Sequence, residues 1–228
     1  MKIMNLFLVL IGCIQFVNGQ TNTKGTYNTG YNNWYYDARE KLYQGLKGKK
    51  VDVVFFGNSI TERGPWHELF GAKYRIANRG IGGDNTYGMK ARVVDVVSMK
   101  PKKIFLMMGI NDIGRGLPTD SILKNYEEII QIIKRKSPKT KIYAQSTLPL
   151  NESKVTLDYQ KGREQNIRSL NDGILALTKK HNITFVNVKE ILADDYVLKP
   201  HYTSDGIHIN ADAYLEWAKY LKSKKFLK

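Results

Sequence analysis

The chain has 228 residues, of which 42% are hydrophobic and 25% charged, a composition typical of one globular domain with a sizeable core. Lysine and arginine outnumber aspartate and glutamate by 36 to 21, which gives a formal net charge of +15. Such a charge can attract nucleic acid, anionic lipid or acidic glycans. No zinc-knuckle, helix-turn-helix or RNA-binding signature accompanies it, so we expect no nucleic-acid partner and interpret the charge as an aid to solubility.

The start of the chain is predicted to be an export signal outside the fold. Met1-Lys2 gives a short basic start, residues 3–17 form a mainly apolar run, and small and polar residues follow at 18–20. We expect cleavage after Gly19, which would remove residues 1–19 and export the protein to the periplasm or the extracellular space. The run is short for a membrane span, so no stable membrane insertion is expected. A buried N-terminal helix is the alternative, although no amphipathic pattern marks one.

Cys13, the lone cysteine, lies within this signal. The mature protein is therefore expected to contain no disulfide and to depend on its core for stability. The stretch Leu10-Ile11-Gly12-Cys13 also resembles a bacterial lipoprotein cleavage box, so lipidation of Cys13 stays open as an alternative.

A leader and a helix are predicted before the main domain. Residues 20–33 are rich in Thr, Asn, Gly and Tyr and are expected to form a flexible leader. Residues 34–46 are predicted to form a helix. One apolar face of this helix would carry Trp34, Ala38, Leu42 and Leu46. Residues 47–228 are then predicted to form one domain, without an internal repeat or a low-complexity tract.

Strand-like runs alternate with helical patterns through this domain. The predicted strands are residues 51–56, 74–77, 103–108, 141–144 and 183–188. The predicted helices are residues 86–97, 121–136, 158–181 and 211–221. Inward positions are expected at Ile122, Tyr126, Ile129, Ile130 and Ile133 in the second helix and at Leu170, Ile174 and Leu177 in the third. This alternation predicts an α/β fold with a mostly parallel sheet covered on both faces.

Three short segments follow successive predicted strands. Ser59 lies after the first strand, Gly83 after the second and Asn111 after the third. The carboxyl ends of parallel strands meet at one edge of the sheet, where ligands bind in such folds. We therefore expect these three segments to lie together.

Ser59 is the candidate nucleophile. It lies two residues past a strand end, where a hydroxyl can project from a tight turn and backbone N–H groups face an incoming oxyanion. A serine at such a junction more often caps a helix, which is the alternative role. Thr61 replaces the second glycine of Gly-x-Ser-x-Gly, so this segment is not the nucleophile elbow of the α/β-hydrolases.

Two further segments offer hydrogen-bond donors. Gly80-Ile81-Gly82-Gly83-Asp84 is a glycine-rich turn that permits close approach of the backbone to a ligand, with a ligand-free turn as the alternative. Asn85 occupies the place of the third glycine that a dinucleotide loop needs, which disfavours a dinucleotide site. Asn111 carries an uncharged N–H₂ donor suited to a developing oxyanion, and its alternative role is a turn-forming Asn-Asp pair.

Asp205 and His208 are a candidate base and the acid that orients it. Their spacing lets a carboxylate orient one ring nitrogen while the other ring nitrogen faces a nucleophile. His201, close to the same loop, is the alternative base, and a surface Asp with a surface His is the alternative without catalysis. The 4 histidines lack metal-ligand spacing and the mature chain would lack cysteine, so no metal is expected.

In this order, the four segments resemble the SGNH superfamily, the GDSL-type esterases and acylhydrolases. The letters of the superfamily name would be Ser59, Gly83, Asn111 and His208, and residues 78–86 are most similar to the platelet-activating-factor acetylhydrolase-like branch and to bacterial carbohydrate esterases. The resemblance implies a three-layer α/β/α sandwich with a flavodoxin-like sheet.

The resemblance also implies the roles of individual residues. Ser59 would be the nucleophile, His208 the general base and acid, and Asp205 the group that orients His208. The backbone N–H groups of Ser59 and Gly83 and the side chain of Asn111 would form the oxyanion hole, and no metal or organic cofactor would be needed. Asn58 stands where the family's GDSL block usually has aspartate, a tolerated variation that would alter hydrogen bonding around Ser59.

Three functions are compatible with this pattern. An exported carbohydrate O-acetylesterase agrees with the export signal and the branch resemblance, and its partner would be a small-molecule or glycan ester. The aromatic residues Tyr31, Trp34, Tyr35 and Tyr36 could stack on sugar or pack on the sheet. A lipid acylhydrolase, such as a lysophospholipase or thioesterase, is disfavoured because the loops after the strands are not notably apolar. A non-catalytic binding module is disfavoured because every catalytic position is filled. The oligomeric state stays open.

Overall fold

A computed structural model describes residues 27–46 and 49–227 of the chain. The expected signal at 1–19 and Cys13 lie outside the described residues. Five parallel strands form one sheet in the order β2-β1-β3-β4-β5. The strands are β1 (Val53–Gly57), β2 (Ile76–Gly80), β3 (Lys103–Met107), β4 (Lys141–Gln145) and β5 (Thr184–Val186). This strand order is that of flavodoxin-like sheets, so the predicted fold is confirmed.

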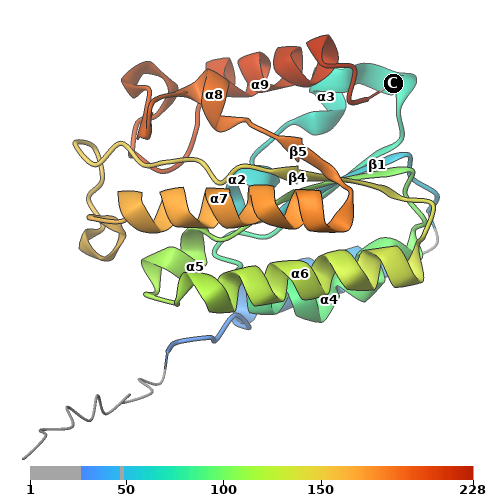
Figure 1. The fold of residues 1–228 in the computed structure, drawn as a ribbon. Helices are drawn as coiled ribbons and strands as arrows, with labels where there is room; N and C mark the ends of the chain where they lie inside the picture. The colour runs from blue at the N-terminus through green and yellow to red at the C-terminus, as the bar shows by residue number, and fades with distance from the viewer. Residues whose placement is uncertain (1–26, 47–48, 228) are drawn as a thin grey trace, which may run out of the picture.

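Helices cover both faces of the sheet. The longer ones are α1 (Trp34–Gly45), α4 (Thr86–Ser98), α6 (Thr119–Lys136), α7 (Glu164–His181) and α9 (Ala211–Ser223), and the short ones are α2 (Ser59–Glu62), α3 (Trp66–Phe70), α5 (Ile110–Gly114) and α8 (Lys189–Leu192). Figure 1 shows α3, α8 and α9 on one side of the sheet and α4, α6 and α7 on the other. The chain therefore forms the three-layer α/β/α sandwich that was expected. None of the helices within the described residues is both long and apolar enough to cross a membrane.

Aromatic side chains of the core pack against β1. All of β1 is buried, and the Phe55 ring stacks on Trp66 of α3 at a centroid distance of 3.9 Å and on Phe105 of β3 at 4.9 Å. Trp66 in turn meets Trp217 of α9 edge-on at 4.9 Å. Aromatic pairs of this kind add to the free energy gained from apolar burial. The aromatic stack therefore anchors β1 to α3 and to the neighbouring strand β3, just before the segment that carries Ser59.

The inward positions of two predicted helices are confirmed. In α6 and α7 the buried residues include Ile122, Tyr126, Ile129, Ile130, Ile133, Leu170, Ile174 and Leu177. However, α7 begins at Glu164 instead of residue 158, and a separate single turn forms over Asp158–Gln160. Gly162, at φ +67°, lies between them in the left-handed region, which interrupts the helix.

The predicted apolar face of α1 is wrong. Trp34 is 81% exposed and Leu42 49% exposed, whereas Tyr36 and Tyr43 are the buried residues of this helix. The two tyrosine hydroxyls donate to backbone carbonyls, Tyr36 to Gly88 at 3.0 Å and Tyr43 to Gly80 at 2.6 Å. A tyrosine can bury its ring and still satisfy its hydroxyl in this way, so these two residues decide which side of α1 packs inward.

A small antiparallel hairpin, β6 (Ala193–Asp194) with β7 (Val197–Leu198), follows α8 and was not expected. It leads into the loop with Asp205 and His208. The Asn151 N–H donates to the Gly206 carbonyl at 2.8 Å, and the Gly206 N–H donates to Thr203 Oγ1 at 2.9 Å. The first bond ties the loop to the segment that follows β4, at the same edge of the sheet as Ser59, and the second lies within the loop itself.

Candidate active site

Ser59 is the first residue of α2, directly after the end of β1. Asn58, not Ser59, caps this helix, because the Asn58 side-chain oxygen accepts the Ile60 N–H at 3.1 Å. The capping alternative for Ser59 is therefore wrong, and the Ser59 hydroxyl is available for another partner. The Asn58 amide nitrogen is buried without a hydrogen-bond partner among the described residues.

The Ser59 hydroxyl lies against His208. Ser59 Oγ is 3.0 Å from His208 Nε2, and His208 Nδ1 is 2.7 Å from Asp205 Oδ2. With Nδ1 protonated, the ring donates to the Asp205 carboxylate and accepts the Ser59 hydroxyl at Nε2. His201 instead contacts the Tyr202 ring at the surface in a tilted arrangement, with ring centroids 4.1 Å apart. The structure thus brings Ser59, His208 and Asp205 into one chain of hydrogen bonds.

Asp205 is held in its ionised form. Its other carboxylate oxygen, Oδ1, accepts the backbone N–H groups of Ile207 at 2.9 Å and of His208 at 2.7 Å. Burial raises the pKa of Asp205, but the hydrogen bonds from the His208 ring and from these two N–H groups outweigh it and lower the pKa to about 2. A carboxylate that stays negative near neutral pH can stabilise an imidazolium beside it.

The glycine-rich turn after β2 lies beside Ser59. A Cβ atom added at Gly82 would come within 3.9 Å of Ser59 Cβ. The next residue, Gly83, has φ +75°, a left-handed conformation that glycine adopts without steric cost. The turn closes through a bond from the Asp84 N–H to the Ile81 carbonyl at 3.2 Å. The backbone N–H groups of this turn are therefore placed next to the candidate nucleophile.

Asn111 joins the same group from the end of β3. It lies in the first turn of α5, half-buried, and its side-chain nitrogen donates to the Asp84 carbonyl at 2.8 Å. This bond uses one amide hydrogen and orients the N–H₂ group, whose second hydrogen can serve another acceptor. All three segments expected at the carboxyl edge therefore meet there, together with the Asp205–His208 loop.

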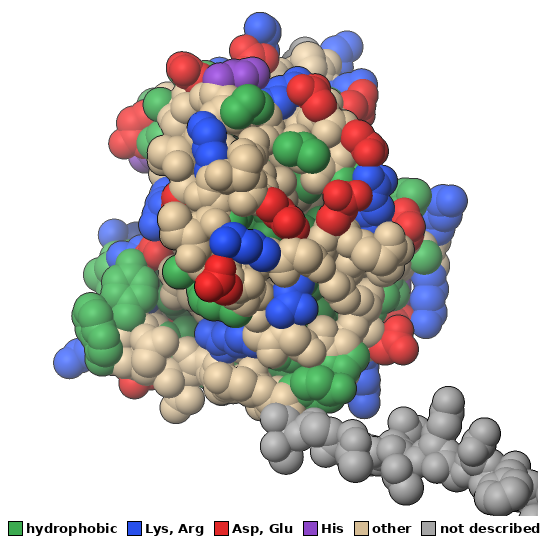
Figure 2. Space-filling model, turned by 90° about the vertical axis from the view of Figure 1, so that its left-hand side faces the viewer, with side chains coloured by type: hydrophobic (Ala, Val, Ile, Leu, Met, Phe, Trp, Pro, Cys, Tyr) green, Lys and Arg blue, Asp and Glu red, His purple; other side chains and the backbone are tan. Residues whose placement is uncertain are grey.

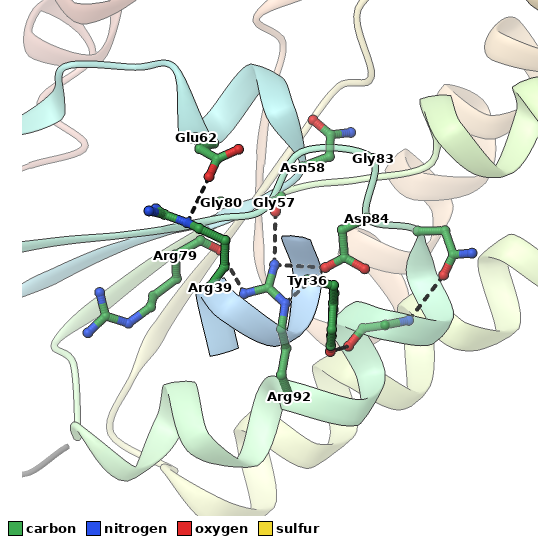
Figure 3. A network of polar contacts seen from close by, with 12 residues as sticks. Tyr36, Arg39, Gly57, Asn58, Glu62, Arg79, Gly80, Gly83, Asp84 and Arg92 are labelled. Carbon is green, nitrogen blue, oxygen red and sulfur yellow. Dashed lines mark hydrogen bonds and ion pairs between the residues drawn. The ribbon is translucent and has the colours of Figure 1, made fainter. Parts of the chain in front are cut away.

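A buried ion pair beneath the turn was missed by sequence reasoning. Arg92 of α4 contacts Asp84 at 2.9 Å and also donates to the carbonyls of Gly57 and Arg79, as Figure 3 shows. Burial raises the pKa of Asp84 to about 6, although Arg92 opposes the rise. The available signal was periodicity, because Arg92 lies in phase with Met89 and Val96 on the buried face of α4.

Two more acidic residues near the site were also missed. Glu62 accepts the Gly82 N–H at 2.7 Å, and the buried Asp112 accepts the Thr86 N–H and hydroxyl at the start of α4. Burial raises the pKa of Asp112, opposed by the hydrogen bonds from Thr86. Neither residue belongs to an apolar pattern. The signal available was position in the sequence, because Glu62 lies three residues after Ser59 and Asp112 directly follows Asn111.

The surface around the site is mixed in character. Figure 2 looks onto the edge where the strands end, and acidic and basic side chains are interspersed over it. A cavity of about 430 Å³ lies between the segment that follows β4, the start of α7 and the β6–β7 hairpin. It is lined by Leu150, Asn151, Glu152, Ser153, Glu164, Ile167, Tyr196, Val197 and Pro200.

Residues 55–215 match the model of the GDSL-like lipase/acylhydrolase family. The chain belongs to this family. This GDSL-like protein is accordingly a carboxylic ester hydrolase, and its resemblance to the GDSL-type esterases and acylhydrolases is confirmed. The match begins after α1, so the N-terminal helix lies outside it.

Solved structures of similar proteins agree with this assignment. A candidate platelet activating factor from Streptococcus pneumonia is 32% identical, with a TM-score of 0.76 over 85% of this chain and 93% of that one. A GDSL-like lipase from Bacteroides thetaiotaomicron VPI-5482 is 27% identical, with a TM-score of 0.72 over 83% and 96% of the two chains. Est24, a carbohydrate acetylesterase from Sinorhizobium meliloti, is 15% identical with a TM-score of 0.65 over 78% and 99%, so it shares the fold.

One curated relative is much longer than this GDSL-like hydrolase. N-acylneuraminate cytidylyltransferase from Streptococcus agalactiae serotype V is 21% identical over 171 residues, which is 75% of this chain. The chain spans 38% of the length of that relative.

Proposed function

We propose that this hydrolase is a serine esterase that removes short acyl groups, chiefly acetyl, from carbohydrates. The observation that carries the proposal is the hydrogen-bonded chain from Ser59 through His208 to Asp205. A hydroxyl, an imidazole and a carboxylate in this order are the parts of a catalytic triad. Their place beside a turn and an amide that offer N–H donors supports acyl transfer.

The proposed mechanism uses each of these groups once per half-reaction. His208 Nε2 takes the proton of Ser59 as Oγ attacks the ester carbonyl, and Asp205 stabilises the imidazolium. The Ser59 and Gly83 N–H groups and the Asn111 side chain stabilise the tetrahedral oxyanion, and loss of one such donor typically costs about 10²–10³ in kcat. The alcohol leaves with a proton from His208, and water then hydrolyses the acyl-enzyme by the same route.

The preference for a short acyl group rests on the loops around the site. Leu148 and Val155, which follow β4, are 1% and 5% exposed, so they contribute to the core instead of an open groove. The mixed charged and polar surface in Figure 2 suits a hydrated substrate better than a lipid chain. A carbohydrate acetylesterase on the same fold is in keeping with this preference.

A lipid acylhydrolase is the second candidate, and one observation favours it. The cavity between the segment after β4 and the β6–β7 hairpin includes Leu150, Ile167 and Val197, which could accommodate part of a longer acyl chain. Ser59 and His208 are not among its lining residues, so a chain that entered it would have to pass beyond the catalytic edge. We therefore rank this candidate below the acetylesterase.

A comparison of chain lengths tests the proposal. The purified protein should hydrolyse p-nitrophenyl acetate faster than p-nitrophenyl decanoate, because the apolar loop residues are buried. Ser59→Ala should reduce hydrolysis of both to the background rate, since the nucleophile is lost. Retained activity in that variant would remove Ser59 as nucleophile, and faster turnover of the decanoate would favour the lipid candidate.

The natural alcohol can be found by measuring released acetate. Acetylated xylan, acetylated pectin, O-acetylated sialic acid and short lipid esters should be offered to wild-type protein and to Ser59→Ala in parallel. We expect acetate from at least one glycan and none from the lipid esters. Release from the lipids alone would contradict the carbohydrate assignment.

Export is a separate proposal that rests on the sequence of residues 1–19. Expression with the full N-terminus should give a mature form that begins at Gln20, outside the cytoplasm. Intact mass of the isolated protein checks this, and a mass increase consistent with a lipid on Cys13 would instead show a lipoprotein. A protein that keeps residues 1–19 in the cytoplasm would contradict both.

A further inference from the structure

The peptide group that carries the Gly83 N–H is held from both sides. On one side, the Gly82 N–H donates to Glu62 Oε2 at 2.7 Å. On the other, the Gly83 carbonyl accepts from Arg115 Nη2 at 3.0 Å. Neither bond uses the Gly83 N–H itself. The two bonds thus hold the peptide groups immediately before and after the one that carries the Gly83 N–H, and they leave this N–H available to a ligand.

Glu62 connects this turn to the candidate nucleophile. Ser59 begins α2 and Glu62 ends it, so the two residues are parts of one short helix. The Glu62 side chain is only 14% exposed. A contact between its carboxylate and Gly82 therefore fixes the position of the turn relative to Ser59. In Figure 3 Glu62 extends from α2 toward the strand ends, beside the glycine-rich turn.

Two residues of α1 hold the Glu62 carboxylate in place. Tyr35 donates its hydroxyl to Glu62 Oε1 at 2.8 Å, and Arg39 Nε forms an ion pair with the same oxygen at 2.9 Å. The hydrogen bond to Glu62, followed by burial, raises the pKa of Tyr35, so this hydroxyl stays protonated and remains a donor. Hydrogen bonds from Tyr35 and from the Gly82 N–H, together with the charge of Arg39, leave the carboxylate little freedom to turn.

The N-terminal segment also contacts Arg115, the residue that holds the Gly83 carbonyl. Arg115, which holds the Gly83 carbonyl, donates in addition to the carbonyl of Gly30. Asn85, immediately after the turn, donates to the carbonyls of Thr29 and Gly30 at 3.3 and 3.4 Å. The segment 29–39 thus touches both restraints on Gly83, although it precedes the residues matched by the family model.

We propose that Glu62 is a positioning residue of the oxyanion hole, and that Tyr35 and Arg39 of α1 keep it in position. This inference rests on the proposed function, in which the Gly83 N–H stabilises the oxyanion. A donor contributes fully only when it is fixed at the place where negative charge develops. A misplacement of about 1 Å by a group away from the chemistry can cost about 10²-fold in rate.

Three variants test the proposal with p-nitrophenyl acetate. Glu62→Ala should lower kcat by at least about 10-fold with little change in KM, because the oxyanion exists only in the transition state. Glu62→Gln keeps one acceptor oxygen and should recover part of that loss. Tyr35→Phe, which removes only the hydroxyl, should lower kcat less than Glu62→Ala and in the same direction.

Matched controls separate positioning from stability. Glu68→Ala removes an exposed carboxylate from α3, and Tyr27→Phe removes a hydroxyl from an exposed tyrosine of the N-terminal segment; both should keep the kcat of the wild type. Thermal unfolding must show each variant folded at the assay temperature. If Glu62→Ala does not fold, Tyr35→Phe and Glu62→Gln decide by the same kcat and KM comparison.

The outcomes distinguish this inference from the proposed function. An inactive Ser59→Ala together with a wild-type kcat in Glu62→Ala and in Tyr35→Phe would overturn only the positioning role. A raised KM with unchanged kcat in the Glu62 variants would also overturn it, because it would place Glu62 in substrate binding. An active Ser59→Ala would instead overturn the proposed function itself.

Discussion

The two edges of the sheet differ in what surrounds them. At the carboxyl edge, Ser59 and Asn111 lie beside the Asp205–His208 loop in a network of directed hydrogen bonds. The amino edge is bordered by lysines: Lys73, Lys102 and Lys103 line a cavity of about 290 Å³ there, and Lys73, Lys222 and Lys225 line an adjoining one of about 200 Å³. The side chains that can do chemistry and this cluster of lysines thus lie at opposite ends of the strands.

Helix direction accounts for much of this separation. The helices α6 and α7 run antiparallel to the strands, so their last turns lie at the amino edge (Figure 1). Those last turns carry Lys134, Arg135 and Lys136 in α6 and Lys179, Lys180 and His181 in α7, while their first turns carry Asp120 and Glu164. Bases at helix C-termini and acids at N-termini interact favourably with the helix dipole. The positive charge therefore follows from the architecture and does not by itself indicate an anionic substrate.

Among variants at the carboxyl edge, Asp205→Asn is expected to cause the largest loss of kcat after removal of the nucleophile. The amide would keep the shape of the side chain but favour the wrong tautomer of His208 and remove the charge that stabilises the imidazolium. Such a change lowers kcat by about 10⁴ in a serine protease. Stopped assays with p-nitrophenyl acetate at neutral pH measure the effect. A fall of less than about 10-fold would contradict the assigned role of Asp205.

Asn111→Ala should have the next largest effect. It removes one donor to the oxyanion and should lower kcat by about 10²–10³ with a small change in KM. It also frees the Asp84 carbonyl, so the melting temperature should be recorded with the kinetics. An unchanged kcat in a folded variant would exclude Asn111 from the oxyanion hole.

Two aspartates, one at each edge, should give opposite pH dependences of stability. Burial raises the pKa of Asp84 to about 6, above its value of about 3.9 in the unfolded chain. The contribution of Asp84 to the free energy of unfolding is therefore fully present below about pH 3.9 and is lost as the pH rises through about 6. Hydrogen bonds from Arg75 lower the pKa of Asp52, so its contribution is present above about pH 4 and is lost as pH falls.

Thermal melts of Asp84→Asn and Asp52→Asn across pH 3–7 check this contrast. Asp84→Asn should remove a decline in stability between about pH 4 and pH 6, and Asp52→Asn should reduce the decline on the acid side. Parallel curves for wild type and Asp84→Asn would contradict the raised pKa of Asp84. Parallel curves for wild type and Asp52→Asn would contradict the lowered pKa of Asp52.

Substitutions at the amino edge are expected to have the smallest effect on activity. The double variant Lys222→Gln/Lys225→Gln removes two charges from this edge, and kcat/KM for neutral p-nitrophenyl acetate should change by less than about twofold, because exposed charges are screened within about 8–10 Å. Repeating the assay at high salt provides the control. A large, salt-sensitive loss would show that the two edges are coupled after all.

The sequence predicted what depends on repeating patterns. Strand–helix alternation placed Ser59, Gly83 and Asn111 at one edge, and the periodicity of α6 and α7 identified their buried residues. Single polar contacts were harder to foresee. Glu62 and Arg92 act through partners that come together only in the folded chain, and nothing in the spacing of these residues indicates those partners.

The prediction of the buried face of α1 was wrong for a related reason. Apolar spacing favoured Trp34 and Leu42, but the helix packs through tyrosines whose hydroxyls reach the carbonyls of Gly80 and Gly88. Apolar spacing alone does not identify a tyrosine that packs inward while its hydroxyl donates to a nearby carbonyl. Similarly, α7 begins later than predicted, because Gly162 adopts a left-handed conformation and one such residue is enough to interrupt a helix.

Arg92 sets a condition for any redesign of this enzyme. Its guanidinium joins the Asp84 carboxylate to the carbonyls at Gly57 and Arg79, so one side chain holds the ends of two adjacent strands together. A lysine carries the same charge but a single nitrogen, and it lacks the planar fork that reaches three acceptors. A transplant of the site into another scaffold would therefore have to carry Arg92 and its carbonyl partners along with the residues that touch the ester.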